Sequence, residues 1–352
     1  MNKTASLTTS LQPLSLPDFS GIEAEQLISV LRKCELGEGE DILQNFEKDF
    51  KKLANVNYCV PVSSATSGLH LALLALEVGE NDEVICPTFT FAASAFPILY
   101  QKATPVFVDS EKDTWNISPE YLEKAIKSRI LAGKKPRAII IVHSYGNPAK
   151  IASLLEIANH YQIPIIEDAA NALGSTYNNL QVGTFGTIGV FSFNRNKIIS
   201  GGAGGSVITN NKVISEKVRY FAHQAKSNLA YYHHENIGYN YGLSPILAEI
   251  IRLQLPTLEK RILLRRYQFD NYLKGYHSEA TFQNEANNSF SNRWLTVFKY
   301  NSKPFPPEYH HVWKPLHTQP VFEKSLYFGN QESVEFFNLG VALPFLRNNI
   351  GQ

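Results

Sequence analysis

Cysteine is scarce in this 352-residue chain, and so is an excess of charge of either sign. The three cysteines, Cys34, Cys59 and Cys86, are odd in number and show no metal-ligand spacing. We therefore expect reduced thiols in a cytoplasmic protein that binds no metal. The formal net charge is only +1, and no cluster of Lys and Arg is dense enough for a basic arm, so we expect no nucleic-acid partner.

Long apolar runs are missing as well. No run approaches the roughly 20 residues that a helix needs to cross a bilayer, so we expect no membrane partner. The segment 1–17 is rich in Ser and Thr and lacks the apolar region of a signal peptide. With 44% apolar residues, the composition is typical of a soluble globular enzyme, and the length suits a large domain plus a smaller one.

What the sequence does contain is an alternation of short apolar runs with helical patterns. Strands are predicted at 58–62, 83–86, 104–108, 138–142 and 164–167. Helices are predicted between them, at 67–76, 92–99, 119–127 and 150–161. This order indicates βαβ units, and hence an α/β fold with a mostly parallel sheet covered by helices on both faces.

The second part of the chain has a different pattern. The stretch 183–209, dense in Gly, Ser and Thr, is typical of short strands and loops. A Leu-rich pattern at 245–266 predicts one long helix that leads into a second domain. We therefore expect a large domain, residues 1–243, and a smaller α+β C-terminal domain, residues 244–352.

The first candidate site is the run of small residues 62–69, which links a predicted strand to a predicted helix. Small side chains let the backbone approach a phosphate, and free N–H groups at a helix start favour an anion. An equally good interpretation is an ordinary turn capped by Ser64 or Thr66.

The second candidate is the pair of carboxylates Glu167 and Asp168 at the end of a buried strand. In open α/β sheets these strand ends face the ligand crevice, where an aspartate can hold a proton on the ring nitrogen of a heterocycle. The alternatives for Asp168 are a helix N-cap and a metal ligand, and the second lacks partner carboxylates nearby in the sequence.

The third candidate is Lys197, in an apolar segment that precedes the glycine-rich run 200–205. Loss of solvation lowers the pKa of an amine toward that of a usable nucleophile. Ser192, shortly before it, can donate a hydrogen bond to a phosphate. The alternative is an exposed lysine in a flexible loop. A fourth segment, 237–241, contains Asn240 and is by itself only an aromatic loop.

Taken in order, these segments resemble the DegT/StrS-type nucleotide-sugar aminotransferases, which are fold type I pyridoxal-phosphate enzymes. The resemblance extends from about Leu14 to Pro344 and includes the segments 87–91 (PTFTF) and 142–146 (VHSYG). It implies that pyridoxal 5′-phosphate is the cofactor and that Lys197 binds it as a Schiff base. The residues that the resemblance assigns to cofactor binding are Ala65, Thr66, Phe91, Asp168, Asn171, Ser192, Lys197 and Asn240.

The resemblance also implies roles for these residues. Lys197 and Asp168 are the catalytic pair: the lysine moves the proton of the amino donor, glutamate, and the aspartate keeps the pyridine nitrogen protonated. Phe91 stacks on the cofactor. Asn240 reaches the phosphate held by a neighbouring subunit, which implies a homodimer. The amino acceptor is a nucleotide-linked keto-sugar.

Three positions depart from the family pattern. Asn171 is shorter than the usual Gln or Glu, Ala203 lies where an acidic residue is common, and Gly242 replaces a common arginine. Two other interpretations are a sugar dehydratase on the same scaffold and a non-catalytic binding or regulatory protein. By resemblance the dehydratases replace the lysine with histidine, so Lys197 argues against the first. The retained cofactor residues argue against the second.

Three further segments resemble the bacillosamine-type enzymes, which aminate C4 of UDP-4-keto-6-deoxy-N-acetylhexosamines for surface glycans such as lipopolysaccharide. These segments are 194–199, 292–296 and 312–321. Trp294 and Trp313 offer flat faces for a sugar or uracil ring, unless they only pack the small domain. The residues predicted to bind the substrate are Arg293, Trp313, Lys314 and His317.

Overall fold

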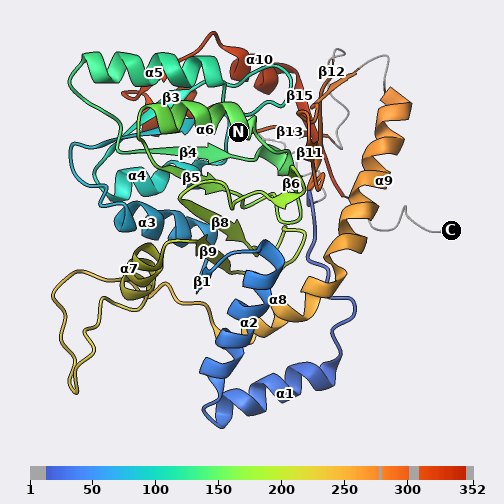
Figure 1. Ribbon diagram of the computed structural model, residues 1–352. Helices are drawn as coiled ribbons and strands as arrows, with labels where there is room; N and C mark the ends of the chain where they lie inside the picture. Colours follow the sequence, from blue (N-terminus) through green and yellow to red (C-terminus); the bar gives the residue numbers. More distant parts are fainter. Residues whose placement is uncertain (1–12, 277–279, 301–308, 346–352) are drawn as a thin grey trace, which may run out of the picture.

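The computed structural model describes residues 13–276, 280–300 and 309–345, and Figure 1 shows their arrangement. Residues 1–12 of the segment for which we expect no signal peptide lie outside these ranges. Within the ranges, no helix is both long enough and apolar enough to cross a membrane.

An eight-stranded sheet is at the centre of the molecule (Figure 1). Its strands, in order across the sheet, are β1 (Tyr58–Val62), β9 (Gly205–Thr209), β8 (Ile188–Ser192), β5 (Ile165–Asp168), β4 (Ala138–Val142), β2 (Glu83–Pro87), β3 (Thr104–Val108) and β14 (Leu326–Phe328). All neighbouring pairs from β8 to β14 are parallel, whereas β9 runs antiparallel to both of its neighbours. The predicted α/β fold with a mostly parallel sheet is confirmed.

The helices of the described ranges precede, connect and follow these strands. They are α1 (Ala24–Glu35), α2 (Gly39–Ala54), α3 (Ala65–Ala75), α4 (Phe96–Tyr100), α5 (Pro119–Leu131), α6 (Ile151–His160), α7 (Lys212–Ala222), α8 (Pro245–Gln254), α9 (Leu258–Tyr276) and α10 (Glu332–Leu339). Successive residues of a strand point to opposite faces of the sheet, so each face presents apolar side chains, and helices cover both faces. In β4, Ile140 and Val142 pack in the core of α3 and α7, while Ile139 and Ile141 pack with α5 and α6.

Two small antiparallel sheets flank the large one. The first has the order β10 (Ala280–Phe282), β12 (Thr296–Tyr300), β15 (Gly340–Leu343) and β13 (His310–His311). The second has the order β11 (Ser289–Phe290), β6 (Thr176–Tyr177) and β7 (Leu180–Gln181). The second sheet thus joins the β6–β7 hairpin of the predicted large domain to a strand of the predicted small one.

Two predicted helices are interrupted. The pattern at 245–266 forms α8 and α9, separated by the 3₁₀ turn Leu255–Thr257. The prediction of one long helix was wrong because Pro256 has no N–H to donate and its ring clashes with the preceding turn. The pattern at 92–99 forms a 3₁₀ turn, Ala92–Ser94, and then α4, which has Pro97 in its first turn.

The C-terminal part of the chain also contributes to the large sheet, because β14 pairs in parallel with β3. The buried carboxylate of Asp109, just after β3, accepts hydrogen bonds from the Tyr327 hydroxyl at 2.6 Å and from the amides of Glu332 and Ser333 at 2.9 and 3.0 Å. This carboxylate fixes the start of α10 and the end of β14. The domain division at residue 244 stays a prediction.

Candidate active site

Lys197 follows β8 and lies among groups contributed by distant segments. Its amine donates a hydrogen bond to Oδ1 of Asn171 and lies 4.4 Å from the centroid of the Trp294 ring. Burial lowers the pKa of the amine to about 8, although the carboxylate of Asp168 acts in the opposite direction. The neutral, nucleophilic form of this lysine is therefore far more populated near neutral pH than that of an exposed lysine.

Asp168 ends β5 at the carboxyl edge of the sheet, and its side chain is buried. Its Oδ2 accepts a hydrogen bond from the hydroxyl of Ser94 at 2.7 Å, and its Oδ1 accepts one from the amide of Ala170 at 3.1 Å. Ser94 in turn shares a 2.8 Å hydrogen bond with the hydroxyl of Thr90. Ser94 is a site residue that the sequence reasoning missed, because only the fold brings it to the carboxylate.

The neighbouring carboxylate, Glu167, has a different use. It points to the other face of the strand and pairs with Nε2 of the buried His143 at 3.0 Å. Three backbone amides of the turn 183–186 donate to it at 2.5 to 2.8 Å. Since Nδ1 of His143 accepts from the amide of Ala149, Nε2 carries the proton that Glu167 accepts. Glu167 therefore stabilises the fold, which leaves Asp168 for the site.

The start of α3 and the end of β8 form a cradle. Ser64 caps the helix by accepting from the amide of Ser67 at 3.0 Å, while the amides of Ala65 and Thr66 precede the first intrahelical hydrogen bond. Ser192 lies opposite Gly205 in the β8–β9 register. A Cβ at Gly205 would come within 2.7 Å of the Ala65 amide nitrogen, so only glycine permits this approach. The arrangement suits an anion such as a phosphate.

Phe91 and Asn240 are the two exposed members of the predicted cofactor set. The Phe91 ring, beyond the carboxyl end of β2, is 62% exposed, which is unusual for a large apolar side chain. Asn240 lies in the segment between α7 and α8, which Figure 1 shows extending away from the sheet. The next residue, Tyr241, accepts a 2.7 Å hydrogen bond from the amide of Ser63 and so joins this segment to the start of α3.

The predicted substrate residues have unequal surroundings. Arg293 is buried, forms a 2.7 Å ion pair with Glu285 and stacks its guanidinium 3.8 Å from the centroid of Phe269. Burial lowers the pKa of Arg293 to about 10. Its positive charge is thus paired with the carboxylate of Glu285 inside the protein. Lys314, in contrast, is exposed.

Trp313 and His317 lie against the carboxyl end of the sheet. The Trp313 ring is partly exposed and stacks on Tyr145, with 4.0 Å between centroids. Nδ1 of His317 is 2.6 Å from the hydroxyl of Thr88, and its ring stacks on Tyr327 at 3.9 Å. Burial lowers the pKa of His317, which favours a neutral ring.

Trp294 differs from its expected use. Its side chain is only 4% exposed, its indole N–H donates to the carbonyl of Asn196 at 2.8 Å, and its ring faces the Lys197 amine. The face that we expected to bind a sugar or uracil ring is covered by protein in this structure. Trp294 belongs to the lysine's surroundings, a role for which the sequence offered no signal beyond its rarity.

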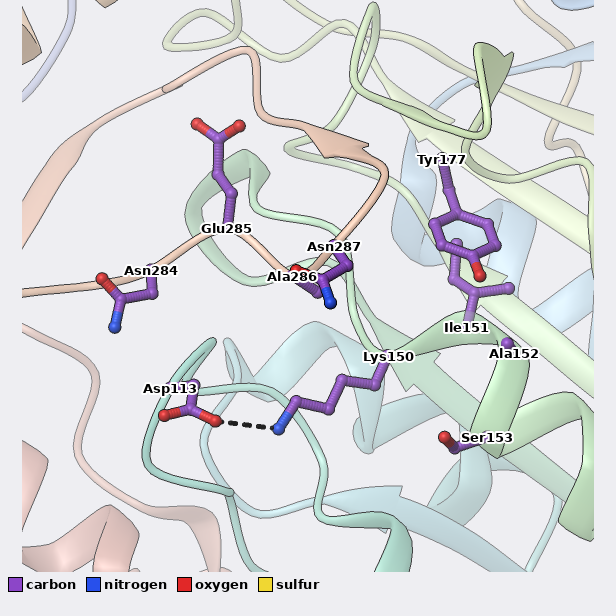
Figure 2. A pocket seen from close by; sticks show the side chains of 10 residues that line it. All are labelled: Asp113, Lys150, Ile151, Ala152, Ser153, Tyr177, Asn284, Glu285, Ala286 and Asn287. Atoms are coloured by element: carbon purple, nitrogen blue, oxygen red, sulfur yellow. Dashed lines mark hydrogen bonds and ion pairs between the residues drawn. The ribbon is translucent and has the colours of Figure 1, made fainter.

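A separate cavity of about 620 Å³ lies at the start of α6, and Figure 2 shows its lining. Lys150 crosses it to form ion pairs with Asp113 at 3.0 Å and Glu111 at 2.8 Å. The ten described residues that line this cavity include none of the predicted site residues. The charge of Lys150 in this cavity is already paired with Glu111 and Asp113. The candidate active site is therefore the group of residues around Lys197, not this cavity.

Comparisons with known proteins identify the relatives of this chain. Residues 18–345 match the DegT/DnrJ/EryC1/StrS aminotransferase family. EpsN of Bacillus subtilis (strain 168), whose name refers to a pyridoxal phosphate-dependent aminotransferase, is 39% identical over 348 residues, covering 94% of this chain and 90% of EpsN. The GDP-perosamine synthase of Escherichia coli O157:H7 is 36% identical over 312 residues, covering 88% of this chain and 84% of the synthase.

A solved structure supports the same assignment. An aminotransferase of this family from Brucella abortus superposes with a TM-score of 0.84 at 26% identity, covering 91% of this chain and 90% of that one. The predicted fold type, enzyme class and cofactor are thus confirmed. The chain belongs to the DegT/DnrJ/EryC1/StrS aminotransferase family and is a pyridoxal phosphate-dependent nucleotide-sugar aminotransferase.

Proposed function

We propose that this enzyme transfers the amino group of glutamate to C4 of a UDP-linked 4-keto-6-deoxy-N-acetylhexosamine, in the cytoplasm, on a route to a surface glycan. One observation carries the proposal: the three segments that resemble bacillosamine-type enzymes are connected by a series of contacts from Lys197 through Trp294 and Tyr145 to Trp313. Trp294 bonds to the carbonyl of Asn196, and Trp313 stacks on Tyr145, whose ring lies nearly parallel to that of Trp294 at 6.2 Å.

The donor set fits pyridoxal phosphate. The helix-start amides of Ala65 and Thr66 and the hydroxyl of Ser192 suit its phosphate, and the exposed ring of Phe91 suits its flat heterocycle. The buried carboxylate of Asp168 suits a protonated pyridine nitrogen. When bound, the cofactor supplies an electron sink for the charge left when the donor loses its α-proton.

The chain's own groups then bind, orient and move protons. Nζ of Lys197 would accept the α-proton of the amino donor and transfer it to C4′ of the cofactor, for which a pKa of about 8 is well matched to neutral pH. Asp168 holds the proton at the ring nitrogen, and Ser94 fixes the carboxylate in place through its 2.7 Å hydrogen bond. Asn171 accepts a hydrogen bond from the lysine amine and so limits where that amine can point.

In this proposal the substrate is bound by Trp313, Lys314 and His317. Trp313 offers a partly exposed ring to a sugar or uracil, and the exposed Lys314 offers charge to a diphosphate. Neutral His317 can hydrogen-bond to a hydroxyl or carbonyl group of the substrate. Arg293 has no part in the proposal, because Glu285 pairs with its guanidinium.

The substrate prediction can be checked by mass spectrometry. With glutamate as donor, we expect the UDP-linked 4-keto sugar to be converted to the amino sugar. We expect its kcat/KM to exceed those of a GDP-linked 4-keto sugar and a UDP-linked 3-keto sugar by about 10- to 100-fold. The GDP sugar is an informative comparison because one relative is named GDP-perosamine synthase. Preference for either alternative sugar would contradict the substrate proposal and leave the aminotransferase assignment intact.

We also propose that the enzyme works as a homodimer in which Asn240 reaches the phosphate bound by the partner. Asn240 is exposed, and its segment presents a set of exposed apolar residues that a second copy can cover. They are Leu229, Tyr231, Tyr232 and Ile237. Because the segment also contacts the start of α3 through Tyr241, a second copy docked there would place its own Asn240 near the cradle.

Asn240→Ala is therefore expected to weaken retention of pyridoxal phosphate about 10-fold, the effect of losing one hydrogen bond to a charged group. Equilibrium dialysis measures the retention, and thermal unfolding should be unchanged. Asn236→Ala, in the same exposed segment, is the matched control and should bind the cofactor normally. A fully active monomer in sedimentation at assay concentration would refute the shared site.

A further inference from the structure

Trp294 contacts the lysine segment in two ways. Its ring centroid is 4.4 Å from Nζ of Lys197, and its indole N–H donates to the carbonyl of Asn196, the residue just before the lysine. An aromatic face attracts an ammonium group through its quadrupole, most strongly where water is excluded. The same side chain thus touches both the reacting amine and the backbone that carries it.

The position of Trp294 is itself fixed by several groups. Its backbone amide donates to Oδ1 of Asn292 at 2.8 Å, and its ring lies nearly parallel to that of Tyr145, at an angle of 17°. Asn292 is fully buried, and its Nδ2 donates to the carbonyls of Asn171 and Leu173, at 2.9 Å each. One asparagine therefore connects Trp294 to Asn171, the two groups that contact the lysine amine.

The residue just before Trp294 adds a further constraint. Arg293 has a φ of +49°, a conformation that non-glycine residues rarely adopt. The contacts of its guanidinium with Glu285 and Phe269 stabilise that conformation. A strained backbone that its surroundings hold in place beside a reacting group is typical of a functional site.

We propose that Trp294 is a positioning residue that holds the free amine of Lys197 in place, together with Asn171, whenever the amine is not bonded to the cofactor. This rests on the proposed role of Lys197 as the residue to which the cofactor attaches. The ring interacts with Nζ from one side while Oδ1 of Asn171 accepts its hydrogen bond. With neither group, a lysine side chain would sample many rotamers, and misplacement by about 1 Å can slow a reaction by up to about 100-fold.

The test separates positioning of the lysine from general support of the site. Pyridoxal phosphate bonds to the lysine, whereas pyridoxamine phosphate uses the same phosphate and ring contacts without bonding to it. Attachment of pyridoxal phosphate can be monitored by its visible absorbance. For Trp294→Met we expect the rate of this attachment to fall about 10-fold or more. We expect the affinity for pyridoxamine phosphate to stay within about 3-fold, because its contacts are untouched. Trp294→Phe keeps the ring and loses the indole hydrogen bond, so it should recover most of the attachment rate.

A second measurement preserves the shape of the side chain. Fluorinated tryptophans placed at position 294 weaken the attraction of the ring for the ammonium form. Each added fluorine should therefore lower the pH at which the rate of cofactor attachment reaches half of its maximum.

Several outcomes would overturn the inference. These are an unchanged attachment rate in Trp294→Met, a parallel loss of affinity for both cofactor forms, or a pH midpoint insensitive to fluorination. A wild-type protein in which pyridoxal phosphate does not attach to Lys197, as shown by peptide mass spectrometry after borohydride reduction, would instead refute the proposed role of the lysine.

Discussion

Lys197→Ala is expected to reduce transamination by about 10⁴-fold, because the variant lacks the amine that we propose bonds to the cofactor and moves the proton. The visible absorbance of the lysine-bound cofactor should disappear as well. Pyridoxamine phosphate should still bind, since the cradle at Ala65, Thr66 and Ser192 does not involve the lysine. Single-turnover assays and equilibrium dialysis measure these two properties separately.

The matched control for this variant is Lys150→Ala. Lys150 is partly exposed and ion-paired to Glu111 and Asp113 at the cavity of Figure 2. Removing its amine should leave turnover and cofactor absorbance near those of the wild type, because surface ion pairs contribute little. If Lys197→Ala kept a tenth of normal turnover or more, the assignment of the lysine would be wrong.

Asp168→Asn is expected to reduce turnover about 100-fold, the effect of replacing a charge-assisted hydrogen bond by a neutral one. The asparagine has nearly the same shape and can still accept from Ser94, so the protein should fold normally. The substitution has a second consequence, at the lysine. The carboxylate favours the charged amine of Lys197, so its removal should lower the pKa of that amine below about 8.

Two measurements check the effect of Asp168→Asn. Steady-state assays give the loss of turnover, and the pH dependence of cofactor attachment gives the shift at Lys197, whose midpoint should move to lower pH. Asp113→Asn, at a more exposed carboxylate that pairs with Lys150, is the control and should change neither. A midpoint that moves upward in Asp168→Asn would contradict the electrostatic argument.

Much of the large sheet was predictable because its strands are buried on both faces and are rich in β-branched residues. The predicted ranges 58–62, 104–108 and 138–142 coincide with β1, β3 and β4. The end of one such strand also pointed to Asp168, since strand ends are local features of a sequence. Pro256 indicates a break between α8 and α9. The regular apolar spacing on both sides of it favours a continuous helix, and the prediction followed that spacing.

The rest of the site depends on contacts between distant parts of the chain. Ser94 and its partner Asp168 are 74 positions apart, and Trp294 and Asn196 are 98 positions apart. No local pattern indicates which serine or tryptophan will reach a given strand end. The sequence likewise presents Arg293 as a free charge, and only the fold brings Glu285 and Phe269 to its guanidinium.

The pairing of β14 with β3 has a consequence for synthesis on the ribosome. The hydroxyl of Tyr327 and the carboxylate of Asp109 that it contacts are 218 positions apart. A nascent chain therefore carries β3 with one edge unpaired until β14 is translated, and during that time the carboxylate of Asp109 lacks the donors of Tyr327, Glu332 and Ser333. Unpaired edges of this kind readily associate with other chains. The last residues of the large sheet to be translated are thus also the ones that close its exposed edge.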